Sequence, residues 1–78
     1  GSFDMSFKKN DKFIVTGFAN NCPNAFKDKI IAMGVIEGQE MIVINKSIFG
    51  GPIAFETNCG IFSLRKKDLE FLELEKVI

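Results

Sequence analysis

Short apolar segments separated by turn residues divide this chain into pieces of strand length. The segments are rich in β-branched and aromatic residues, which fit the pleated surface of a sheet. They span residues 12–18, 40–45, 53–57, 61–64 and 71–77. The pattern therefore predicts a mainly β protein of about five strands.

Local features add detail to these strands. Gly17 lies inside the first strand, where it allows a bend or a bulge. Residues 41–44 (MIVI) are apolar throughout, which predicts that the second strand is covered on both faces. Residues 58–60 (NCG) predict a tight hairpin turn, with Gly60 at a position that tolerates a positive φ. Residues 65–68 (RKKD) predict a short helical turn before the last strand.

One helix interrupts the strands. Phe26, Ile30 and Met33 recur at the spacing i, i+4 and i+7, which places them on one apolar face. Residues 23–24 (PN) suit its start, because proline needs no amide donor in the first turn and asparagine supplies a capping oxygen. Gly34 suits its end, because glycine accepts the left-handed conformation that closes many helices.

Chain length and strand number predict one small domain. With 78 residues and 8.7 kDa, the chain has room for one hydrophobic core. A strongly bent sheet of this size hides its edges by closing on itself, so we expect a small β-barrel with an inserted helix. Residues 1–2 are interpreted as the remnant of an expression tag, residues 3–10 as a segment that trails or pairs loosely at an edge, and residues 11–78 as the domain.

The balance of charges narrows the classes of partner. Ten basic and ten acidic residues give a net charge of zero and a pI near 6.4, so the chain lacks the cationic field of a nucleic-acid-binding domain. No apolar run approaches ~18 residues, so insertion into a membrane is not expected. The two cysteines form no C-x-x-C pair and no secretory leader is evident, which favours a cytoplasmic protein.

The lack of histidine limits catalysis and metal binding. The chain contains no histidine, which is the usual general base at neutral pH and the commonest ligand of transition metals. Its carboxylates are scattered over positions predicted to lie on the surface, with no cleft to hold a pair of them. We therefore expect neither an enzyme nor a resident cofactor.

Two segments are candidates for contact with a protein partner. Ile48 and Phe49 lie in a loop that looks exposed, where large apolar side chains often mark an interface; alternatively, Phe49 folds back over an open barrel end. Leu64, Arg65 and Lys66 form the second segment. Arg65 suits a partner carboxylate or an ion pair across the barrel, while the alternative for the whole basic run is a solvated turn.

The order of these motifs resembles the FeoA family, small cytosolic proteins of the bacterial ferrous iron uptake system. The resemblance covers about residues 11–77 and is most specific in residues 50–68 (GGPIAFETNCGIFSLRKKD). Asn10 and Glu37 stand where the family often has glycine and proline. The resemblance implies an SH3-like β-barrel with an inserted helix. It also implies a regulatory or assembly role beside FeoB, the membrane permease with a cytosolic GTP-binding domain.

These observations lead to the hypothesis of a non-enzymatic interaction module. We expect the loop at Ile48 and Phe49 and the turn at Leu64, Arg65 and Lys66 to bind the cytosolic region of a FeoB-type permease. An exposed apolar loop also leaves weak self-association open. The competing hypothesis is an Fe2+ carrier or sensor, because the domain also resembles the C-terminal SH3-like module of metal-dependent repressors. Carboxylates without histidine would bind Fe2+ only weakly.

Overall fold

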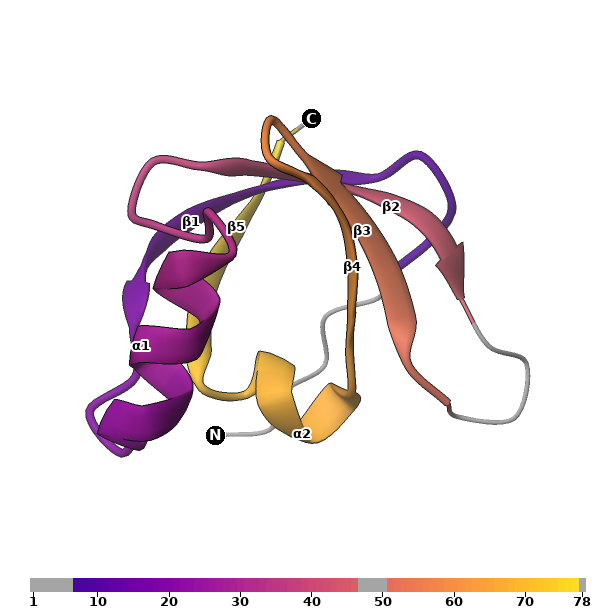
Figure 1. Ribbon diagram of the computed structural model, residues 1–78. Helices are drawn as coiled ribbons and strands as arrows, with labels where there is room; N and C mark the ends of the chain where they lie inside the picture. Colours follow the sequence, from indigo (N-terminus) through magenta and orange to yellow (C-terminus); the bar gives the residue numbers. More distant parts are fainter. Residues whose placement is uncertain (1–6, 47–50, 78) are drawn as a thin grey trace.

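The five expected strands are present, and two helices lie between them. The computed structural model describes residues 7–46 and 51–77. Along this part of the chain the elements are β1 (Lys12–Phe18), α1 (Asn24–Ala32), β2 (Glu40–Lys46), β3 (Ile53–Thr57), β4 (Gly60–Leu64), α2 (Lys66–Leu69) and β5 (Leu72–Val77), as Figure 1 shows. The sequence pattern thus predicted each of these strands and both helices, with small differences at their ends.

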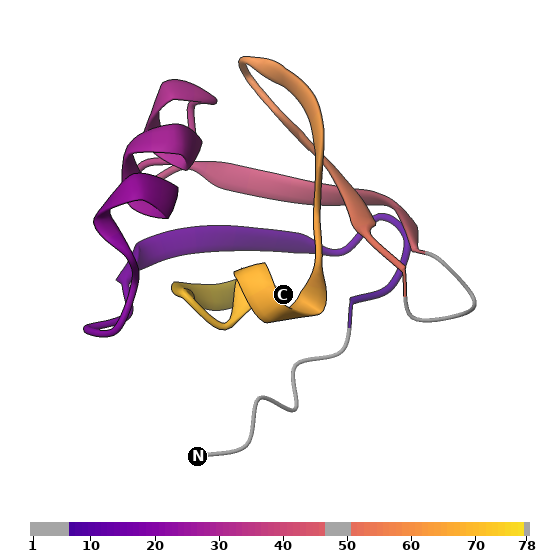
Figure 2. The same ribbon diagram turned by 60° about the horizontal axis from the view of Figure 1, so that its bottom comes forward.

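The strands form one antiparallel sheet in the order β4-β3-β2-β1-β5. The edges are therefore β4 and β5, which do not pair with each other. The sheet curls, and α1 and α2 lie on its open side (Figures 1 and 2). The mainly β class is confirmed, but the expected closed barrel is an open sheet. The short helix α2 follows β4 and precedes β5, and its buried Leu69 fills space between these edges.

Two bulges help to bend the sheet. The register of β1 against β5 shifts just before Gly17, as the glycine predicted, and the hydroxyl of Thr16 donates to the carbonyl of Glu73 at 3.1 Å. The register of β2 against β3 shifts just before Asn45. An extra residue in one strand of a pair bends that strand and increases its twist. The bulges therefore contribute to the curl that encloses the core.

A core of apolar side chains that are at most 4% exposed lies between the inner face of the sheet and the segments that cover its open side. They are Phe7, Phe13, Val15, Ile30, Val35, Met41, Val43, Ile53, Phe55, Leu64, Leu69 and Leu72. Phe7 is 1% exposed, and its ring centroid lies 4.8 Å from that of Phe13 and 5.9 Å from that of Phe55. The expectation that residues 3–10 trail or pair loosely is therefore wrong for Phe7.

The outer face of β2 is only partly covered. Met41 and Val43 are buried, whereas Ile42 and Ile44 on the other face are half-buried. The prediction that β2 is covered on both faces is therefore wrong. Among the described residues, no helix or strand packs over the outer face of β2.

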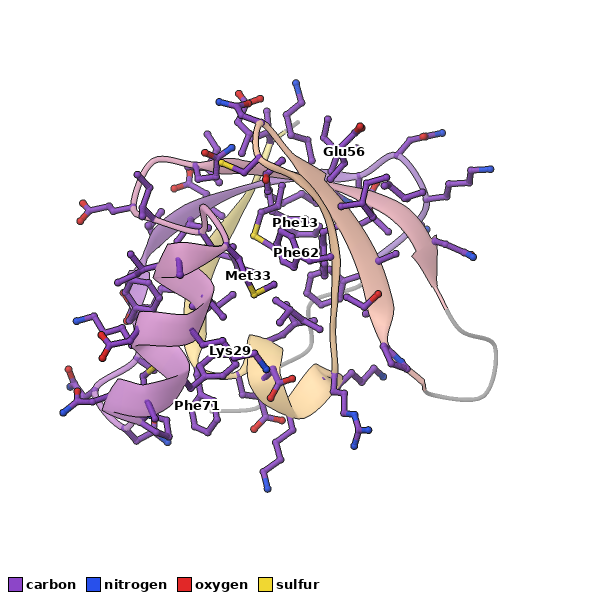
Figure 3. All side chains as sticks on the ribbon, in the orientation of Figure 1. Phe13, Lys29, Met33, Glu56, Phe62 and Phe71 are labelled. Atoms are coloured by element: carbon purple, nitrogen blue, oxygen red, sulfur yellow. The ribbon has the colours of Figure 1, made fainter. Side chains whose placement is uncertain are left out.

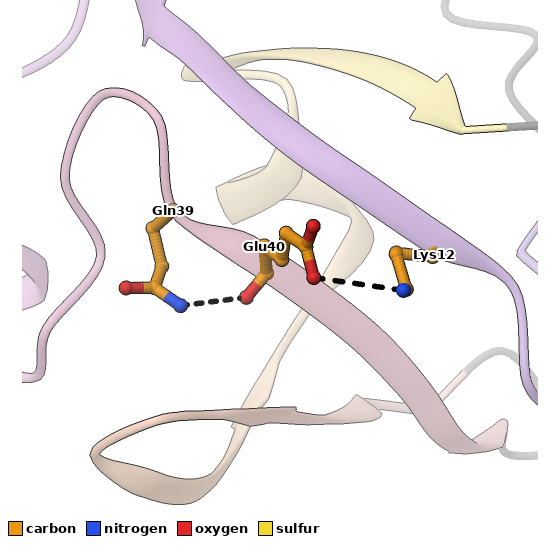
Figure 4. Close-up of polar contacts among 3 residues, drawn as sticks. All are labelled: Lys12, Gln39 and Glu40. Atoms are coloured by element: carbon orange, nitrogen blue, oxygen red, sulfur yellow. Dashed lines mark hydrogen bonds and ion pairs between the residues drawn. The ribbon is translucent and has the colours of Figure 1, made fainter.

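Polar groups occupy the same outer face beside β2. Lys12 of β1 lies 3.6 Å from the carboxylate of Glu40, and both side chains remain about half exposed. The side-chain amide of Gln39 donates to the carbonyl of Glu40 at 2.9 Å (Figure 4). Exposed ion pairs of this kind are worth about 0–1 kcal/mol, so this pair adds little stability.

The helix α1 covers the open side of the sheet with the predicted face. Its first residue is Asn24, preceded by Pro23 in an extended conformation. Ile30 is buried, and Phe26 and Met33 pack against the core. The 3.6-residue period therefore identified the buried face correctly.

The predicted end of α1 at Gly34 is confirmed. Gly34 has a φ of +92°, its N–H donates to the carbonyl of Ile31 at 2.9 Å, and the N–H of Val35 donates to the carbonyl of Ile30 at 2.9 Å. This pair of bonds is the Schellman motif, which satisfies the last carbonyls of a helix. The tip of the β3–β4 hairpin lies against this turn, since a Cβ added to Gly34 would be 2.5 Å from Sγ of Cys59.

The turn before β1 contains an asparagine with a positive φ. Asn10 has a φ of +75°, a conformation that asparagine tolerates better than most residues. Its N–H donates to the carbonyl of Val43 at 2.7 Å, and the N–H of Lys8 donates to Oδ2 of Asp11 at 3.0 Å. The turn predicted at residues 10–11 is therefore confirmed.

Candidate functional site

The candidate site is the stretch Arg65–Lys67, which we call the basic turn. It begins where β4 ends and continues into the first residues of α2. Leu64 before it and Leu69 after it are buried in the core, with 4% and 0% of their surfaces exposed. The turn is therefore anchored at both ends, while the side chains of Arg65, Lys66 and Lys67 are exposed.

Backbone hydrogen bonds fix the conformation of the basic turn. The N–H of Arg65 donates to Oδ2 of Asp68 at 3.2 Å, and its carbonyl accepts the N–H of Leu69 at 3.1 Å. The first of these bonds is half of a capping box, which satisfies a donor that the helix would leave free. Arg65 itself is extended, with φ −79° and ψ 158°. These contacts direct the three cationic side chains outward without using their charges.

No described carboxylate forms an ion pair with the side chains of the basic turn. The two ion pairs among residues 7–46 and 51–77 are Lys12 with Glu40 and Lys76 with Asp11, both elsewhere in the fold. Arg65 has no ion-pair partner there, so the alternative of an ion pair across the barrel finds no support in the described part of the chain. The charges of the turn are available to another molecule.

Aromatic side chains connect the end of α2 to α1. Phe71 follows α2, and its ring centroid lies 5.5 Å from that of Phe26 on α1. Lys27 of α1 lies 5.2 Å from the ring centroid of Phe18. In Figure 3, Lys29 and Met33 project from α1 on the open side of the sheet, on which Phe62 of β4 also lies. Cationic and half-buried apolar groups therefore share this side.

The predicted contact residues differ in their exposure to solvent. Arg65 and Lys66 are exposed neighbours, as a contact surface requires. Leu64 is a core residue, so its side chain positions the turn but offers almost no surface of its own. Ile48 and Phe49 lie outside the described residues.

One exposed residue near the turn did not enter the predicted surface. Ile61 in β4 is 67% exposed and lies opposite Glu56 of β3. The two-residue hairpin turn fixes this register, and side chains paired across strands point to the same face. The solvated Glu56 was therefore the signal that Ile61 faces outward.

The described residues hold no buried polar side chain and no cluster of metal ligands. Among them, every buried side chain is apolar. No three Cys, Asp or Glu side chains within residues 7–46 and 51–77 are grouped closely enough to hold a metal ion. Neither helix of that part of the chain is long and apolar enough to cross a membrane.

Comparison with known proteins places this fold. The model of the FeoA domain matches residues 5–76, nearly the whole chain. The chain belongs to the FeoA family. The matched region begins before Phe7, which agrees with the burial of Phe7 in the core.

Solved FeoA structures have the same architecture. The chain is similar to a FeoA-like protein from Clostridium acetobutylicum, with 26% identity, a TM-score of 0.78 and coverage of 94% of this chain and 83% of that one. The chain is also similar to a FeoA protein from Chlorobium tepidum, with 20% identity, a TM-score of 0.80 and coverage of 94% of this chain and 68% of that one. A crystal structure of an iron uptake regulatory protein (FeoA) has 22% identity and a TM-score of 0.74, with coverage of 95% of this chain and 90% of that one. The SH3-like fold implied by the resemblance is therefore confirmed, with an open sheet.

Proposed function

We propose that this chain is an accessory protein of ferrous iron uptake that binds the cytosolic region of a FeoB-type permease through its basic turn. Membership of the FeoA family supports the link with ferrous iron uptake. The permease as partner, and a cytoplasmic location beside it, come from the role that the family resemblance implies.

The observation that carries this proposal is the unpaired charge of a rigid turn. Arg65, Lys66 and Lys67 are exposed, and none forms an ion pair with a described residue. Their backbone is already held by Asp68 and by the buried Leu69. Binding therefore orders little of the backbone, which lowers the entropic cost of association.

The chemistry of the turn indicates the surface that it fits. Arg65 presents a planar guanidinium that bonds a carboxylate through two parallel N–H groups, and each lysine adds a point charge. The partner surface should therefore be acidic. Ile48 and Phe49 remain part of the proposed contact surface, although they lie outside the described residues.

The test is an NMR titration of labelled chain with the cytosolic GTP-binding region of its permease. We expect shifts that cluster at residues 65–68, and a loss of affinity of about tenfold or more in the double variant Arg65→Glu, Lys66→Glu. The matched control is Lys8→Glu, Lys9→Glu, which makes the same change of charge at exposed positions before β1. Equal affinity of the two double variants, or shifts that leave residues 65–68 unaffected, would overturn the proposal.

A further inference from the structure

The backbone of β4 is open along one side. The hairpin joins Thr57 to Gly60 through a two-residue turn, and residues that flank such a turn share hydrogen bonds. Hydrogen-bonded and non-bonded pairs then alternate along an antiparallel ladder. The N–H and C=O groups of Ile61 and Ser63 therefore point away from β3, toward the free edge of the sheet.

These groups have no partner in the described part of the chain. No described residue outside β3 bonds to the backbone of Ile61 or Ser63. The side chain of Ile61 is 67% exposed, and Ser63 is exposed as well. The hairpin tip is closed, because Cys59 lies against Gly34. The accessible part of the edge therefore runs from Ile61 to the basic turn.

The chemistry of this edge permits strand addition. Proteins commonly protect their edge strands with charged side chains, which resist pairing with another chain. The sequence of β4 is GIFSL, with no charged residue, whereas that of β5 is LELEKV, with three. The open edge is therefore the unprotected one, and it leads directly into three unpaired cations.

We infer that β4 accepts an extended segment of the partner as an added antiparallel strand. That the partner is the permease rests on the proposed function above; the mode of binding rests on the edge itself. Strand addition gives affinity through main-chain hydrogen bonds, and selectivity through side chains at alternate positions.

Direction and charge define the chemistry of this segment. A strand antiparallel to β4 has its N-terminal end beside Arg65, so acidic residues belong at that end. The following residues alternate, and those on the inner side meet Phe62, which is half-buried on the open side of the sheet (Figure 3). The segment is therefore acidic first, then alternately apolar.

A second copy of this chain fits the edge less well. Its own β4 carries no carboxylate, so pairing of two β4 strands would bring no acidic group of that strand to the basic turn. The charges along β5 oppose its pairing with a strand of another copy, so the cations at Arg65 and Lys66 favour a foreign acidic segment.

Two variants at Ser63 separate the contribution of its backbone N–H to binding from that of its side chain. Ser63→Pro removes an N–H that points outward, where an edge strand tolerates proline, so the fold should persist. Ser63→Ala removes only the hydroxyl. We expect Ser63→Pro to weaken binding about tenfold or more and Ser63→Ala to leave it unchanged. Amide spectra of both variants establish that they are folded.

The experiment uses two probes and follows amide hydrogen exchange by NMR. One probe is the cytosolic region of the permease; the other is a synthetic peptide with two acidic residues followed by alternating valine and threonine. With either probe, we expect the amides of Ile61 and Ser63 to exchange at least about tenfold more slowly, and Ser63→Pro to abolish this protection in Ile61.

The outcomes separate the two proposals. Binding of the permease region that depends on Arg65 but leaves both amides unprotected would overturn strand addition and support the proposed function. No binding of the permease region would overturn the proposed function, and the peptide then decides strand addition alone. If the amides of Ile61 and Ser63 become protected as the protein concentration rises, with no probe added, a second copy of the chain occupies the edge. That outcome would overturn the inference.

Discussion

The β5 edge of the sheet presents Glu73, Glu75 and Lys76 within six residues, while the opposite edge, β4, presents five residues without a charge. Both strands send apolar side chains into the same core, through Leu72 in β5 and Leu64 in β4. Their inner faces are thus alike. The difference lies in what each edge shows to another molecule.

This difference shows how an open sheet can remain selective. Charges along β5 oppose the approach of another strand, since desolvating them is costly. The edge of β4 carries no charge, and its tip alone is covered, where Cys59 lies against the end of α1 at Gly34. The middle of the strand is therefore available, and in the proposal above the basic turn selects the charge of the segment that binds there.

The two edges of the sheet share one core, so loss of a central core side chain should weaken both. A substitution of Phe7 is the strongest test. Its ring contacts Phe13 of β1, the neighbour of β5, and Phe55 of β3, the neighbour of β4. We expect Phe7→Ala to lower the free energy of unfolding by about 3–5 kcal/mol, because it leaves a cavity between these rings. Urea denaturation followed by circular dichroism measures the loss, and Phe7→Leu, which fills part of the cavity, should cost less. Faster amide exchange confined to one edge would contradict the shared core.

The contact that closes the β4 tip should have the next largest effect. An alanine at Gly34 would hold a left-handed φ at a cost of about 1–2 kcal/mol and would also meet Cys59. We expect Gly34→Ala to destabilise the protein by about 2–4 kcal/mol in total. A double-mutant cycle with Cys59→Gly should recover the part due to the clash, about 1 kcal/mol or more. Strict additivity in the cycle would show that the tip does not rest on this turn.

Much of the fold was predictable because its signals are local. The strands follow from short apolar segments between turn residues, and α1 follows from the period of Phe26, Ile30 and Met33 together with Gly34 as its end. The positive φ of Gly60 and the bulge at Gly17 follow from residue chemistry. Each of these features depends on residues close together in the sequence.

The errors concern contacts between distant segments. Phe7 ends a short alternation with Phe3 and Met5 that is too brief to assign an element, so only the folded structure shows that its ring stacks on the core. Whether β4 and β5 pair depends on how α2 fills the space between them, which no local pattern encodes.

At the candidate site, sequence reasoning found the charges but reversed two apolar residues. Arg65 and Lys66 stood out as an exposed basic run. Leu64 was assigned to the surface, and Ile61 was not, although the turn register places Leu64 inward and Ile61 outward. The register of the β3–β4 hairpin therefore decides which side chains of β4 face outward.

The cap of α2 should have a smaller effect, restricted to the β4 side. Asp68→Ala removes the bond from the N–H of Arg65 at 3.2 Å, and we expect a loss of about 0.5–1.5 kcal/mol in unfolding free energy. The same change should weaken binding to the permease region, because the basic turn loses its fixed conformation. Asp68→Asn keeps an acceptor and serves as control. Amide exchange at Arg65 measures the local change, and unaltered exchange in Asp68→Ala would contradict this role of the carboxylate.

The smallest effect on stability, and the sharpest test of the two edges, comes from placing a new charge on each of them. Ile61 on β4 and Val77 on β5 are both exposed apolar residues, 67% and 37% respectively. We expect Ile61→Glu and Val77→Glu each to change the free energy of unfolding by less than about 1 kcal/mol. Only Ile61→Glu should weaken binding of the acidic, alternating peptide, because the new carboxylate repels the acidic residues and gives β4 a charge such as β5 already has. An isothermal titration of both variants measures the difference. Equal loss in the two, or loss in Val77→Glu alone, would show that the uncharged edge is not where the segment binds.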